Sequence, residues 1–576
     1  LPAVRRALGS GARLALLKGR SNYVCHYHLR RHLEDGRFER RDEAASLHRI
    51  QRFAATSPTG DRAEFGGIAE DSPLWAKATS TRENCLGQDC PDIDRCFVFR
   101  ARQAAQQADV VVVNHHLFCA DLALRDEGVS ELLPSANAVI FDEAHQLPEI
   151  AVQFFGRSLS SHQLTDFGRD LLCIGLADAR DAADWTTVVG TLEQAQREWR
   201  LAAGRPGRRD ALQLRAETGH RAALARLLEV LEQIDDLLAQ AAGRSRDLLR
   251  LALRVGELRM RLARWLEQLA ALGQPTTGGD PASEPEMPDE AVLWCEVHRA
   301  GVTLHATPLS VAPALQRARE QLPRAWVFVS ATLAVADGFS HFTEAIGMPD
   351  ARTLQLGSPF DYPRNARLLV PRCGNPSDPG FADCLVDVCW PLLQANAGRA
   401  FVLCTSLRMV ERVAGLLAER ITQQAEPLTL LVQGSAARAA LLEHFRIADA
   451  PVLVGSASFW EGVDVTGRQL SLVIIDKLPF APPDDPVLGA RIAALRRRGR
   501  DPFREIQLPA AAMALKQGAG RLIRSETDRG LLVVGDERLV TRGYGRSLLR
   551  SMPPFGVVRD VGEALAWLTA ARSTPD

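Results

Sequence analysis

The chain has 576 residues, of which 46% are hydrophobic and 24% charged, and its formal charge is −1 at pH 7. This length predicts three or four domains, and the composition excludes a largely disordered or fibrous protein. The near-neutral charge gives no global basic signature, so any contact with nucleic acid has to come from local grooves. No apolar stretch approaches the roughly 20 residues that span a bilayer, and no signal-peptide pattern is present, so we expect a cytoplasmic protein without membrane contact.

Short, fully apolar runs recur along the chain, each close to a turn or helix signal. Such runs predict buried parallel strands in α/β layers. They form one group before residue 335 and another after residue 395, so we expect two α/β domains. The runs are 110–113, 138–141, 325–329, 400–403, 451–454, 472–475 and 530–534.

Between the two groups the apolar residues recur at helical spacing instead. Residues 157–272 have almost no strand signal, so we predict an all-helical insertion, either an antiparallel hairpin or a bundle. The stretch 273–289 is rich in Gly, Pro and polar residues and predicts a linker or mobile loop. The periodic apolar residues are Leu224, Leu227, Leu228, Leu231, Ile234, Leu238, Leu248, Leu251, Val255, Leu258, Leu262, Trp265 and Leu269.

Eleven cysteines over this length are too sparse for a disulfide scaffold and indicate a ligand cluster plus scattered core thiols. Cys85, Cys90 and Cys96 lie in a polar, loop-like region, and Cys25 precedes them by about sixty residues. Their wide, unequal gaps favour a cubane iron–sulfur cluster held by four thiolates, because structural zinc usually has tighter Cys-x2-Cys pairs. Zinc and unliganded thiols are the alternative interpretations.

The apolar run 138–141 ends in Asp142 and Glu143, with His145 two residues later. A strand that ends this way places both acids at the carboxyl edge of a parallel sheet, where α/β proteins bind ligands. One carboxylate there can hold Mg²⁺, while its neighbour orients and deprotonates a water that attacks a γ-phosphate. Two solvated acids at the start of a helix are the alternative.

Far downstream, Gln517 and Gly520 precede Arg521 and Arg524. Two arginines three residues apart share one face if the segment is helical, and their forked guanidinium groups suit a phosphate whose charge grows in a transition state. Arginine accounts for 65 of the 69 basic residues, so the pair alone is close to background. Gln517 and Gly520 at their spacing make the segment more specific.

Two further segments follow predicted strands. Glu461, Gly462 and Asp464 come after the run 451–454, where acids and glycines can link a nucleotide site to a polymer site or form a plain turn. The segment 330–333 ends the run 325–329 with two hydroxyl groups and by itself indicates nothing.

Together these segments resemble the XPD-like iron–sulfur DNA helicases of superfamily 2, and within them the bacterial branch of DinG and YoaA. The resemblance covers essentially the whole chain, in order. It identifies 142–145 as the DEAH box, 330–333 as motif III, 462 and 464 as part of motif V, and 517–524 as motif VI. Further matching segments are 18–25, 110–118, 358–362 and 475–480.

The resemblance implies an α/β fold with two RecA-like motor domains that clamp ATP between them. An iron–sulfur domain and a helical arch project from the first motor, and single-stranded DNA threads the hole that they form. The implied activity is ATP-dependent 5′-to-3′ unwinding of single-stranded or forked DNA in replication or repair. The implied boundaries are 1–24, 101–156 and 290–365 for the first motor, 25–100 for the iron–sulfur domain, 157–289 for the arch and linker, and 366–576 for the second motor.

The resemblance also assigns roles to residues. Asp142 would coordinate Mg²⁺, Glu143 would activate water and His145 would couple the box to motif VI. Gln517, Arg521 and Arg524 would reach ATP from the second motor, and Glu461, Gly462 and Asp464 belong to the nucleotide-binding set. The implied ligands of a 4Fe–4S cluster are Cys25, Cys85, Cys90 and Cys96.

Contacts with partners follow from the same resemblance. Five basic residues flank the cluster ligands and are candidates for contact with DNA phosphates, and solvated surface charge is the alternative for each of them. We expect a monomer, and a replication clamp-loader or polymerase subunit is a candidate protein partner. The five basic residues are Arg20, Lys77, Arg82, Arg95 and Arg100.

One family element is missing, the phosphate-binding loop G-x-x-x-x-G-K-[ST], because no Gly-Lys dipeptide occurs in the 576 residues. The N–H groups and lysine of this loop normally hold the β- and γ-phosphates. The family places it upstream of residues 18–25, so we expect a truncated N-terminus or a misassigned start, and negligible ATP turnover by these residues alone. The alternative is an iron–sulfur protein that binds single-stranded DNA or a replication partner without motor activity.

Overall fold

The computed structural model describes every residue except 37, 39–40, 70–71, 127–131, 273–290, 322–323, 336–337, 457–458, 460–464, 466–468, 483 and 574–576. The linker expected at 273–289 therefore lies outside the described residues. The chain divides into two compact units. One comprises Leu1–Phe141, Gln146–Val327 and Pro486–Ala490, and the other comprises Asp142–His145, Phe328–Asp485 and Arg491–Asp576. None of the described helices combines the length and apolarity needed to cross a membrane.

A small helical region at the start of the first unit holds the four predicted cluster cysteines. Its apolar core includes Leu47, Ile50, Trp75 and Phe97, all nearly inaccessible to solvent. Gly60 has φ +63°, and a Cβ there would lie 2.2 Å from the Phe97 ring, so only glycine fits this turn. The helices are α1 (Pro2–Ala7), α2 (His26–Asp35), α3 (Arg41–Thr56), α4 (Leu74–Ala78) and α5 (Phe97–Gln106).

Two separate two-stranded sheets follow, and their strands coincide with the predicted runs 110–113, 138–141 and 325–329. The first pairs β1 (Leu14–Leu16) in parallel with β2 (Val110–Val112), and the second pairs β3 (Ala138–Asp142) with β8 (Ala325–Val329). The expectation of full burial is wrong here, since Val110 is 41% and Ile140 68% exposed. Among the described residues each of these sheets has only two strands, and both strands are edge strands, so part of each strand is exposed to solvent. The adjoining helices are α6 (His115–Asp126), α7 (Leu147–Phe155) and α13 (Ala312–Gln321).

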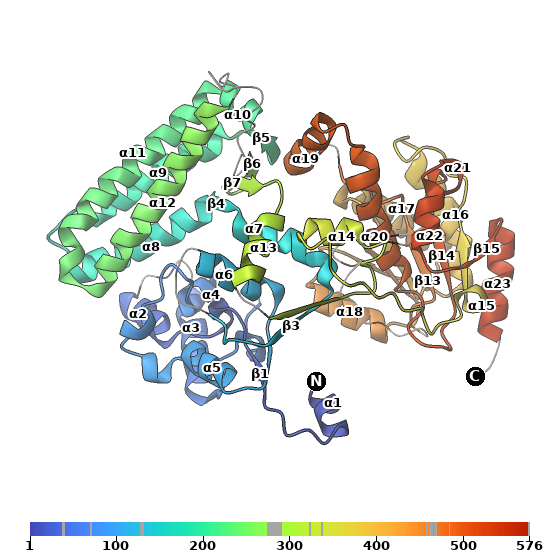
Figure 1. Cartoon of the computed structure of the whole chain (residues 1–576), viewed down its shortest axis with the longest axis horizontal. Helices are drawn as coiled ribbons and strands as arrows, with labels where there is room; N and C mark the ends of the chain where they lie inside the picture. Colours follow the sequence, from blue (N-terminus) through green and yellow to red (C-terminus); the bar gives the residue numbers. More distant parts are fainter. Residues whose placement is uncertain are drawn as a thin grey trace. The chain divides into compact units, whose positions relative to one another are not determined.

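Four long helices share one apolar core, which confirms the predicted helical insertion (Figure 1). Nearly all the periodic leucines named above are buried in this core. The first long helix begins with a capping box, in which Ser160 Oγ accepts from the Gln163 N–H and Gln163 Oε1 accepts from the Ser160 N–H. The helices are α8 (Ser161–Asp178), α9 (Trp185–Ala202), α11 (Thr218–Ala241) and α12 (Arg246–Ala271), with a short α10 (Ala211–Ala216).

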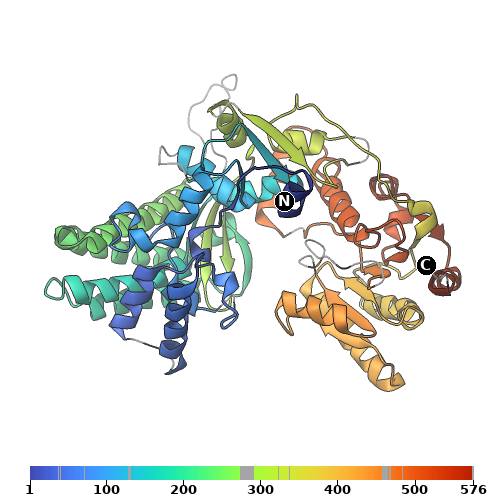
Figure 2. The ribbon, with the colours of Figure 1, turned by 90° about the horizontal axis from the view of Figure 1, so that it is seen from below.

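An antiparallel sheet of order β4-β7-β6-β5 lies at one end of the long helices (Figures 1 and 2). The expectation of an insertion without strands is therefore wrong at two places, β4 and β5. Both are short, polar edge strands, so they carry no apolar run that would predict them. The strands are β4 (Arg157–Ser160), β5 (Gly207–Asp210), β6 (Ala291–Val297) and β7 (Val302–Pro308).

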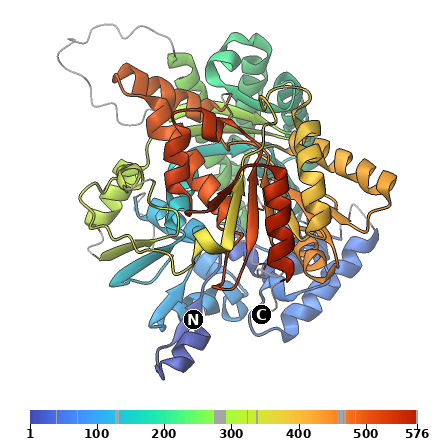
Figure 3. The same cartoon turned by 90° about the vertical axis from the view of Figure 1, so that its right-hand side faces the viewer.

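The second unit contains a parallel sheet of seven strands, in the order β11-β12-β10-β13-β14-β9-β15 (Figure 3). The central strands are buried on both faces, because alternate residues enter two different cores: Phe401 and Val473 pack on one side, Val402 and Ile474 on the other. The four predicted runs in this unit are confirmed as β10, β12, β13 and β14. The strands are β9 (Ala366–Leu369), β10 (Ala400–Leu403), β11 (Thr429–Val432), β12 (Pro451–Gly455), β13 (Leu472–Ile475), β14 (Gly530–Val534) and β15 (Gly556–Val558).

Helices cover both faces of this sheet (Figure 3). One core receives α18, α20 and α22, and the other receives α16, α17 and α23. This layered arrangement is the α/β fold expected from the sequence. The helices are α14 (Ser340–Ala345), α15 (Tyr362–Asn365), α16 (Phe381–Ala395), α17 (Leu407–Gln424), α18 (Arg438–Ile447), α19 (Pro486–Arg497), α20 (Leu508–Ala519), α21 (Arg538–Thr541), α22 (Gly545–Ser551) and α23 (Val561–Ser573).

Candidate functional site

The acidic box and motif VI meet through a chain of hydrogen bonds, which we call the relay. Ser330 Oγ, just after β8, donates to Glu143 Oε2 at 2.9 Å and lies 2.9 Å from His145 Nδ1. A hydroxyl has one proton, so Ser330 accepts from an Nδ1–H group of a neutral His145. Nε2 of that tautomer is an acceptor, and the side-chain nitrogen of Gln517 donates to it at 2.5 Å. The relay therefore runs from Glu143 through Ser330 and His145 to Gln517.

The backbone at the box is strained. Glu143 has φ 49°, in the left-handed region that a residue with a Cβ rarely adopts. Its N–H donates to Asp142 Oδ1 at 3.1 Å, and its side chain is 58% exposed. Thr332, which is buried, holds the Ser330 hydroxyl in place, because its backbone N–H donates to Ser330 Oγ at 3.1 Å. Strained residues cluster at functional sites, where the surrounding structure holds them in place.

Motif VI is only partly helical. Gln517 lies in the last turn of α20, which ends at Ala519, so Arg521 and Arg524 occupy the turn that follows. The condition under which the two arginines would share a helix face, a helical segment, is therefore not met. Asp528 shapes this turn by accepting from the Arg524 N–H at 2.8 Å. Three other residues expected at the nucleotide site, Glu461, Gly462 and Asp464, lie outside the described residues.

The four predicted cluster cysteines are neighbours. Cys25 immediately precedes α2, and Cys96 immediately precedes α5. Burial raises the pKa of the Cys25 thiol to about 12, and the other three thiols are close enough to raise it further. Burial likewise raises the pKa of Cys90, with contributions from Cys85 and Cys96. The fold thus brings four thiols from distant segments into one neighbourhood.

A buried histidine that sequence reasoning missed connects the segment of Cys25 to the segment of Cys85. His28, one turn after Cys25, places Nε2 3.2 Å from the carbonyl oxygen of Asn84, which precedes Cys85. No group of three or more His, Cys, Asp or Glu side chains among the described residues converges tightly enough to hold a single metal ion. A cubane differs from a single ion, because each of its four irons takes one thiolate. Four neighbouring thiols are a donor set of the kind that such a cluster uses.

The first unit also contains a cavity of about 570 Å³, which we call the arginine cavity. Apolar residues of α6 line one side, and cationic residues from α5, β4, α12 and the segments near Cys25 and Cys85 line the rest. Burial lowers the pKa of Arg102, and the nearby charge of Arg20 adds to this effect. The basic residues that line the cavity are Lys18, Arg20, Arg82, Arg102, Arg157, Arg261 and Arg264, beside one acid, Glu257.

The five basic residues predicted to contact DNA lie in different surroundings. Arg20 and Arg82 line the arginine cavity. Lys77 is wrong as a candidate, because its side chain is buried and its Nζ lies 2.8 Å from Glu43 Oε2. Arg100 places its guanidinium 4.6 Å from the centre of the Phe97 ring. The remaining candidate, Arg95, lies near His26.

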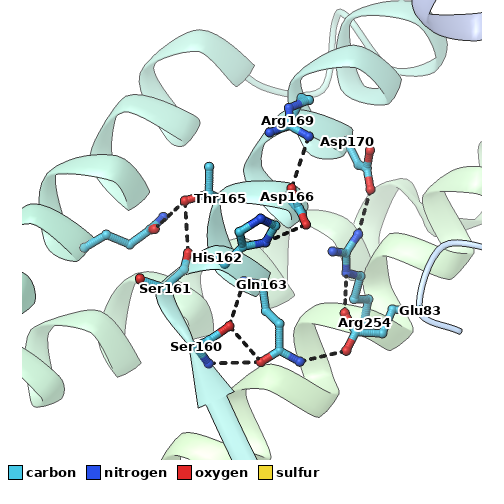
Figure 4. Close-up of polar contacts among 11 residues, drawn as sticks. Glu83, Ser160, Ser161, His162, Gln163, Thr165, Asp166, Arg169, Asp170 and Arg254 are labelled. Carbon is cyan, nitrogen blue, oxygen red and sulfur yellow. Dashed lines mark hydrogen bonds and ion pairs between the residues drawn. The ribbon is translucent and has the colours of Figure 1, made fainter. Parts of the chain in front are cut away.

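A buried ion-pair network, the Arg254 network, ties the cysteine region to the helical insertion (Figure 4). Arg254 of α12 lies 2.7 Å from Asp170 of α8 and 3.3 Å from Glu83, two residues before Cys85. Gln163 donates to the other oxygen of Glu83 at 2.9 Å. Arg254 is only 6% exposed, so its charge is compensated by these two carboxylates, and Glu83 has a second cation in Arg261 at 3.7 Å.

Comparison with known proteins gives consistent matches. Residues 76–164 match the family described as DEAD_2, and residues 389–555 match the one described as the helicase C-terminal domain. The chain is 42% identical over 575 residues to the ATP-dependent DNA helicase YoaA of Escherichia coli (strain K12), covering 100% of this chain and 87% of the relative. The chain belongs to the YoaA/DinG-type family of XPD-like superfamily 2 helicases.

Further relatives agree with this assignment. The chain is 40% identical over 571 residues to the YoaA helicase of Haemophilus influenzae, covering 99% of this chain and 86% of the relative. It is 31% identical over 587 residues to the ATP-dependent helicase DinG of Mycobacterium tuberculosis (strain ATCC 25618 / H37Rv), covering 96% and 82%. A solved XPD helicase structure aligns with a TM-score of 0.52 at 15% identity, covering 97% of this chain and 89% of that one. The resemblance and the α/β fold predicted from the sequence are both confirmed.

Proposed function

We propose that this chain is the motor of an ATP-dependent DNA helicase that unwinds single-stranded or forked DNA in the 5′-to-3′ direction, in replication or repair. The relay carries this proposal, because it connects the carboxylate that would activate water to the segment that would contact ATP. Binding of DNA alone requires no such connection. The YoaA and DinG relatives, whose printed names describe ATP-dependent helicases, support the same activity.

Each residue of the relay has a proposed chemical role. Glu143 takes the proton of the attacking water, and the Ser330 hydroxyl fixes the orientation of its carboxylate. His145 passes changes in the position of Gln517 back to Glu143. Asp142 would hold Mg²⁺, which neutralises charge on the phosphates when bound. Arg521 and Arg524 would stabilise the charge that develops on the transferred phosphoryl group.

The proposal includes a dependence on a phosphate-binding loop. Without the backbone N–H groups and the lysine of such a loop, the β- and γ-phosphates have no cradle. The 576 residues lack the motif, and they span 86–87% of the YoaA relatives. We therefore propose that these residues need a segment that supplies the loop before they turn ATP over at the rate of a helicase.

We also propose that Cys25, Cys85, Cys90 and Cys96 hold a 4Fe–4S cluster. When bound, the cluster cross-links segments that have little regular structure of their own. Cys25 would fix the start of α2, and Cys96 would fix the start of α5. His28 would keep the segments of Cys25 and Cys85 in register through its contact with Asn84.

The arginine cavity is the proposed passage for single-stranded DNA. Arg20, Arg102, Arg157 and Arg264 line it, and none has an ion-pair partner in the described part of the chain. Unpaired guanidinium groups in a partly buried cavity favour a polyanion, and phosphates satisfy them without any sequence preference. The apolar wall on α6 offers a surface for bases.

The decisive experiment measures unwinding by the chain fused to a segment that supplies the phosphate-binding loop, purified anaerobically. We expect unwinding of duplexes with 5′ tails and not of those with 3′ tails, and loss of activity in Glu143→Gln and Cys90→Ser. Unwinding from 3′ tails would overturn the polarity. DNA binding with no ATP turnover in the fused protein would favour the alternative, a cluster protein that binds DNA or a replication clamp-loader or polymerase subunit without motor activity.

A further inference from the structure

The solvent-facing side of α12 carries large apolar residues where water would favour polar ones. Leu249, Leu253 and Met260 are 50%, 58% and 48% exposed. The only other large apolar side chain this exposed in the described residues of the helical insertion is Leu201, on α9. At 3.6 residues per turn, the three α12 residues fall within about 40° of one another around the axis. They form one apolar stripe.

A cationic stripe runs beside the apolar one. Arg246, Arg250 and Arg264 also fall within about 40° of one another, on the adjacent side of α12. The side chain of Arg246 is 71% exposed, and Arg246 and Arg250 reach the loop before Cys90 through the backbone oxygens of Asp89 and Leu86. Arg250 bonds a backbone oxygen and keeps its charge available to a further anion, whereas Arg246 shares its charge with the Asp89 carboxylate at 3.8 Å.

Both stripes continue into the arginine cavity. Met260 from the apolar stripe and Arg264 from the cationic stripe line the cavity wall. The acids on this face are neutralised locally, since Glu257 lies 3.3 Å from Arg261 and Asp89 lies 3.8 Å from Arg246. The face is therefore an extension of the proposed DNA passage along the outside of the helical insertion.

We propose that this face of α12 is a binding track for single-stranded nucleic acid outside the cavity, a step that rests on the proposed function. Phosphates lie along Arg246, Arg250 and Arg264, and bases pack on Leu249, Leu253 and Met260. Bases present a π-face to any apolar or sulfur-containing side chain, so such a track needs no sequence preference.

The dimensions and charge favour a nucleic acid strand over a protein helix. From Leu249 to Met260 the helix rises about 16 Å, the length of about five stacked nucleotides at roughly 3.4 Å each. A polyanion matches three arginines in line, with apolar contacts displaced to one side. A neutral amphipathic helix would leave the arginine stripe without a partner.

The test compares binding of labelled dT6 and dT20 oligonucleotides to the anaerobically purified 576-residue chain. Leu249→Gln/Leu253→Gln should weaken dT20 binding about tenfold, with an unchanged salt dependence, because only base contacts are lost. Arg246→Gln/Arg250→Gln should weaken dT20 binding and reduce the slope of log K against log salt by about 1.4, at roughly 0.7 per phosphate. Leu201→Gln, which changes a more exposed leucine on α9, is the matched control and should bind like the wild type.

The outcomes separate the track from the cavity. Arg102→Ala, at a cavity residue outside α12, should weaken binding of dT6 and dT20 alike at an unchanged iron content, whereas the α12 variants should leave dT6 unaffected. Loss of dT20 affinity in the α12 variants with no effect of Arg102→Ala would uphold the track and remove the cavity from the proposed function. Wild-type affinity of Leu249→Gln/Leu253→Gln for dT20 would overturn the track and leave the face to a protein partner.

Discussion

The side-chain amide of Gln517 donates a hydrogen bond to Nε2 of His145 at 2.5 Å, although 372 residues separate them in the chain. This bond requires a neutral imidazole whose proton is on Nδ1, and Ser330 selects that tautomer by accepting from Nδ1–H. A movement of α20 that displaced Gln517 would therefore change the hydrogen bonds that orient the Glu143 carboxylate. The contact gives the second unit a direct mechanical connection between motif VI and the acidic box.

Ser330→Ala tests this connection. Removal of the hydroxyl frees the Glu143 carboxylate and lets His145 adopt either tautomer, so we expect ATP turnover to fall about 10- to 100-fold, an effect in the range typical of a misoriented catalytic base. The measurement is kcat in the protein fused to a phosphate-binding loop, and single-stranded DNA affinity should stay unchanged. Ser435→Ala, which removes a hydroxyl bonded only to a nearby backbone carbonyl, is the control. Turnover of Ser330→Ala at the wild-type rate would contradict the relay.

Iron content tests the cluster proposal. Anaerobically purified protein should contain about four irons per chain, as a 4Fe–4S cluster requires. Serine at Cys25, Cys85, Cys90 or Cys96 should remove most of that iron, because each thiolate holds one corner of the cubane. Cys404→Ser, a buried thiol in the core of the second unit, should retain it. One zinc ion per chain in place of iron would instead support the zinc interpretation.

Salt dependence tests the arginine cavity. Arg102→Ala should weaken single-stranded DNA binding several-fold and reduce the salt slope by about 0.7, because one phosphate contact is lost. Arg226→Ala should change neither quantity, since Arg226 lies on the surface of the helical insertion and pairs with Glu229 at 3.1 Å. The measurement is a titration of oligothymidylate at several salt concentrations. Equal slopes for the wild type and Arg102→Ala would show that DNA does not enter the cavity.

The stability of the second unit should depend on pH through Asp476. Burial raises the pKa of this carboxyl to about 6, although Thr405 and the Lys477 N–H donate hydrogen bonds to it. A raised pKa in the folded state means that stability is greatest below the unfolded value near 3.8 and falls as pH rises through about 6. The ionised carboxylate then costs about 3 kcal/mol at pH 7.5, since each pKa unit corresponds to 1.36 kcal/mol.

Asp476→Asn should remove this cost. The asparagine oxygen can accept from both backbone N–H groups, and its NH₂ group can donate to the Thr405 hydroxyl, so the contacts are preserved. We expect the free energy of unfolding to increase by about 1–3 kcal/mol at pH 7.5 and to differ little from the wild type at pH 4. Urea denaturation at the two pH values measures this. A variant less stable than the wild type at pH 7.5 would rule the assignment out.

Removal of the cation alone from the Arg254 network should lower the free energy of unfolding. Arg254→Ala leaves the partly buried Asp170 carboxylate without its cation, whereas Glu83 keeps Arg261 at 3.7 Å, so we expect a loss of about 3 kcal/mol in stability. Arg254→Met combined with Asp170→Asn and Glu83→Gln removes the charges together and should recover most of that loss. Thermal unfolding measures both variants. Equal stability of Arg254→Ala and the triple variant would mean that the network contributes little.

The sequence by itself determined the features that depend on local pattern. Short apolar runs located β10, β12, β13 and β14, because a strand buried on both faces has to be apolar throughout. Helical spacing of leucines located α11 and α12, because one face of each helix packs into a shared core. The order of the motifs along the chain pointed to the correct helicase family, because each motif is a short run of adjacent residues that can be read without the fold.

Only the tertiary structure decided features that depend on distant segments meeting. Ser330 indicated nothing alone, and its role follows from contacts with residues more than 180 positions away. Lys77 looked like its exposed basic neighbours, yet Glu43 holds it in a buried pair. Edge strands β4 and β5 are polar and were missed for that reason. Local composition records the burial of an element, whereas the partners of a side chain follow from how the elements pack.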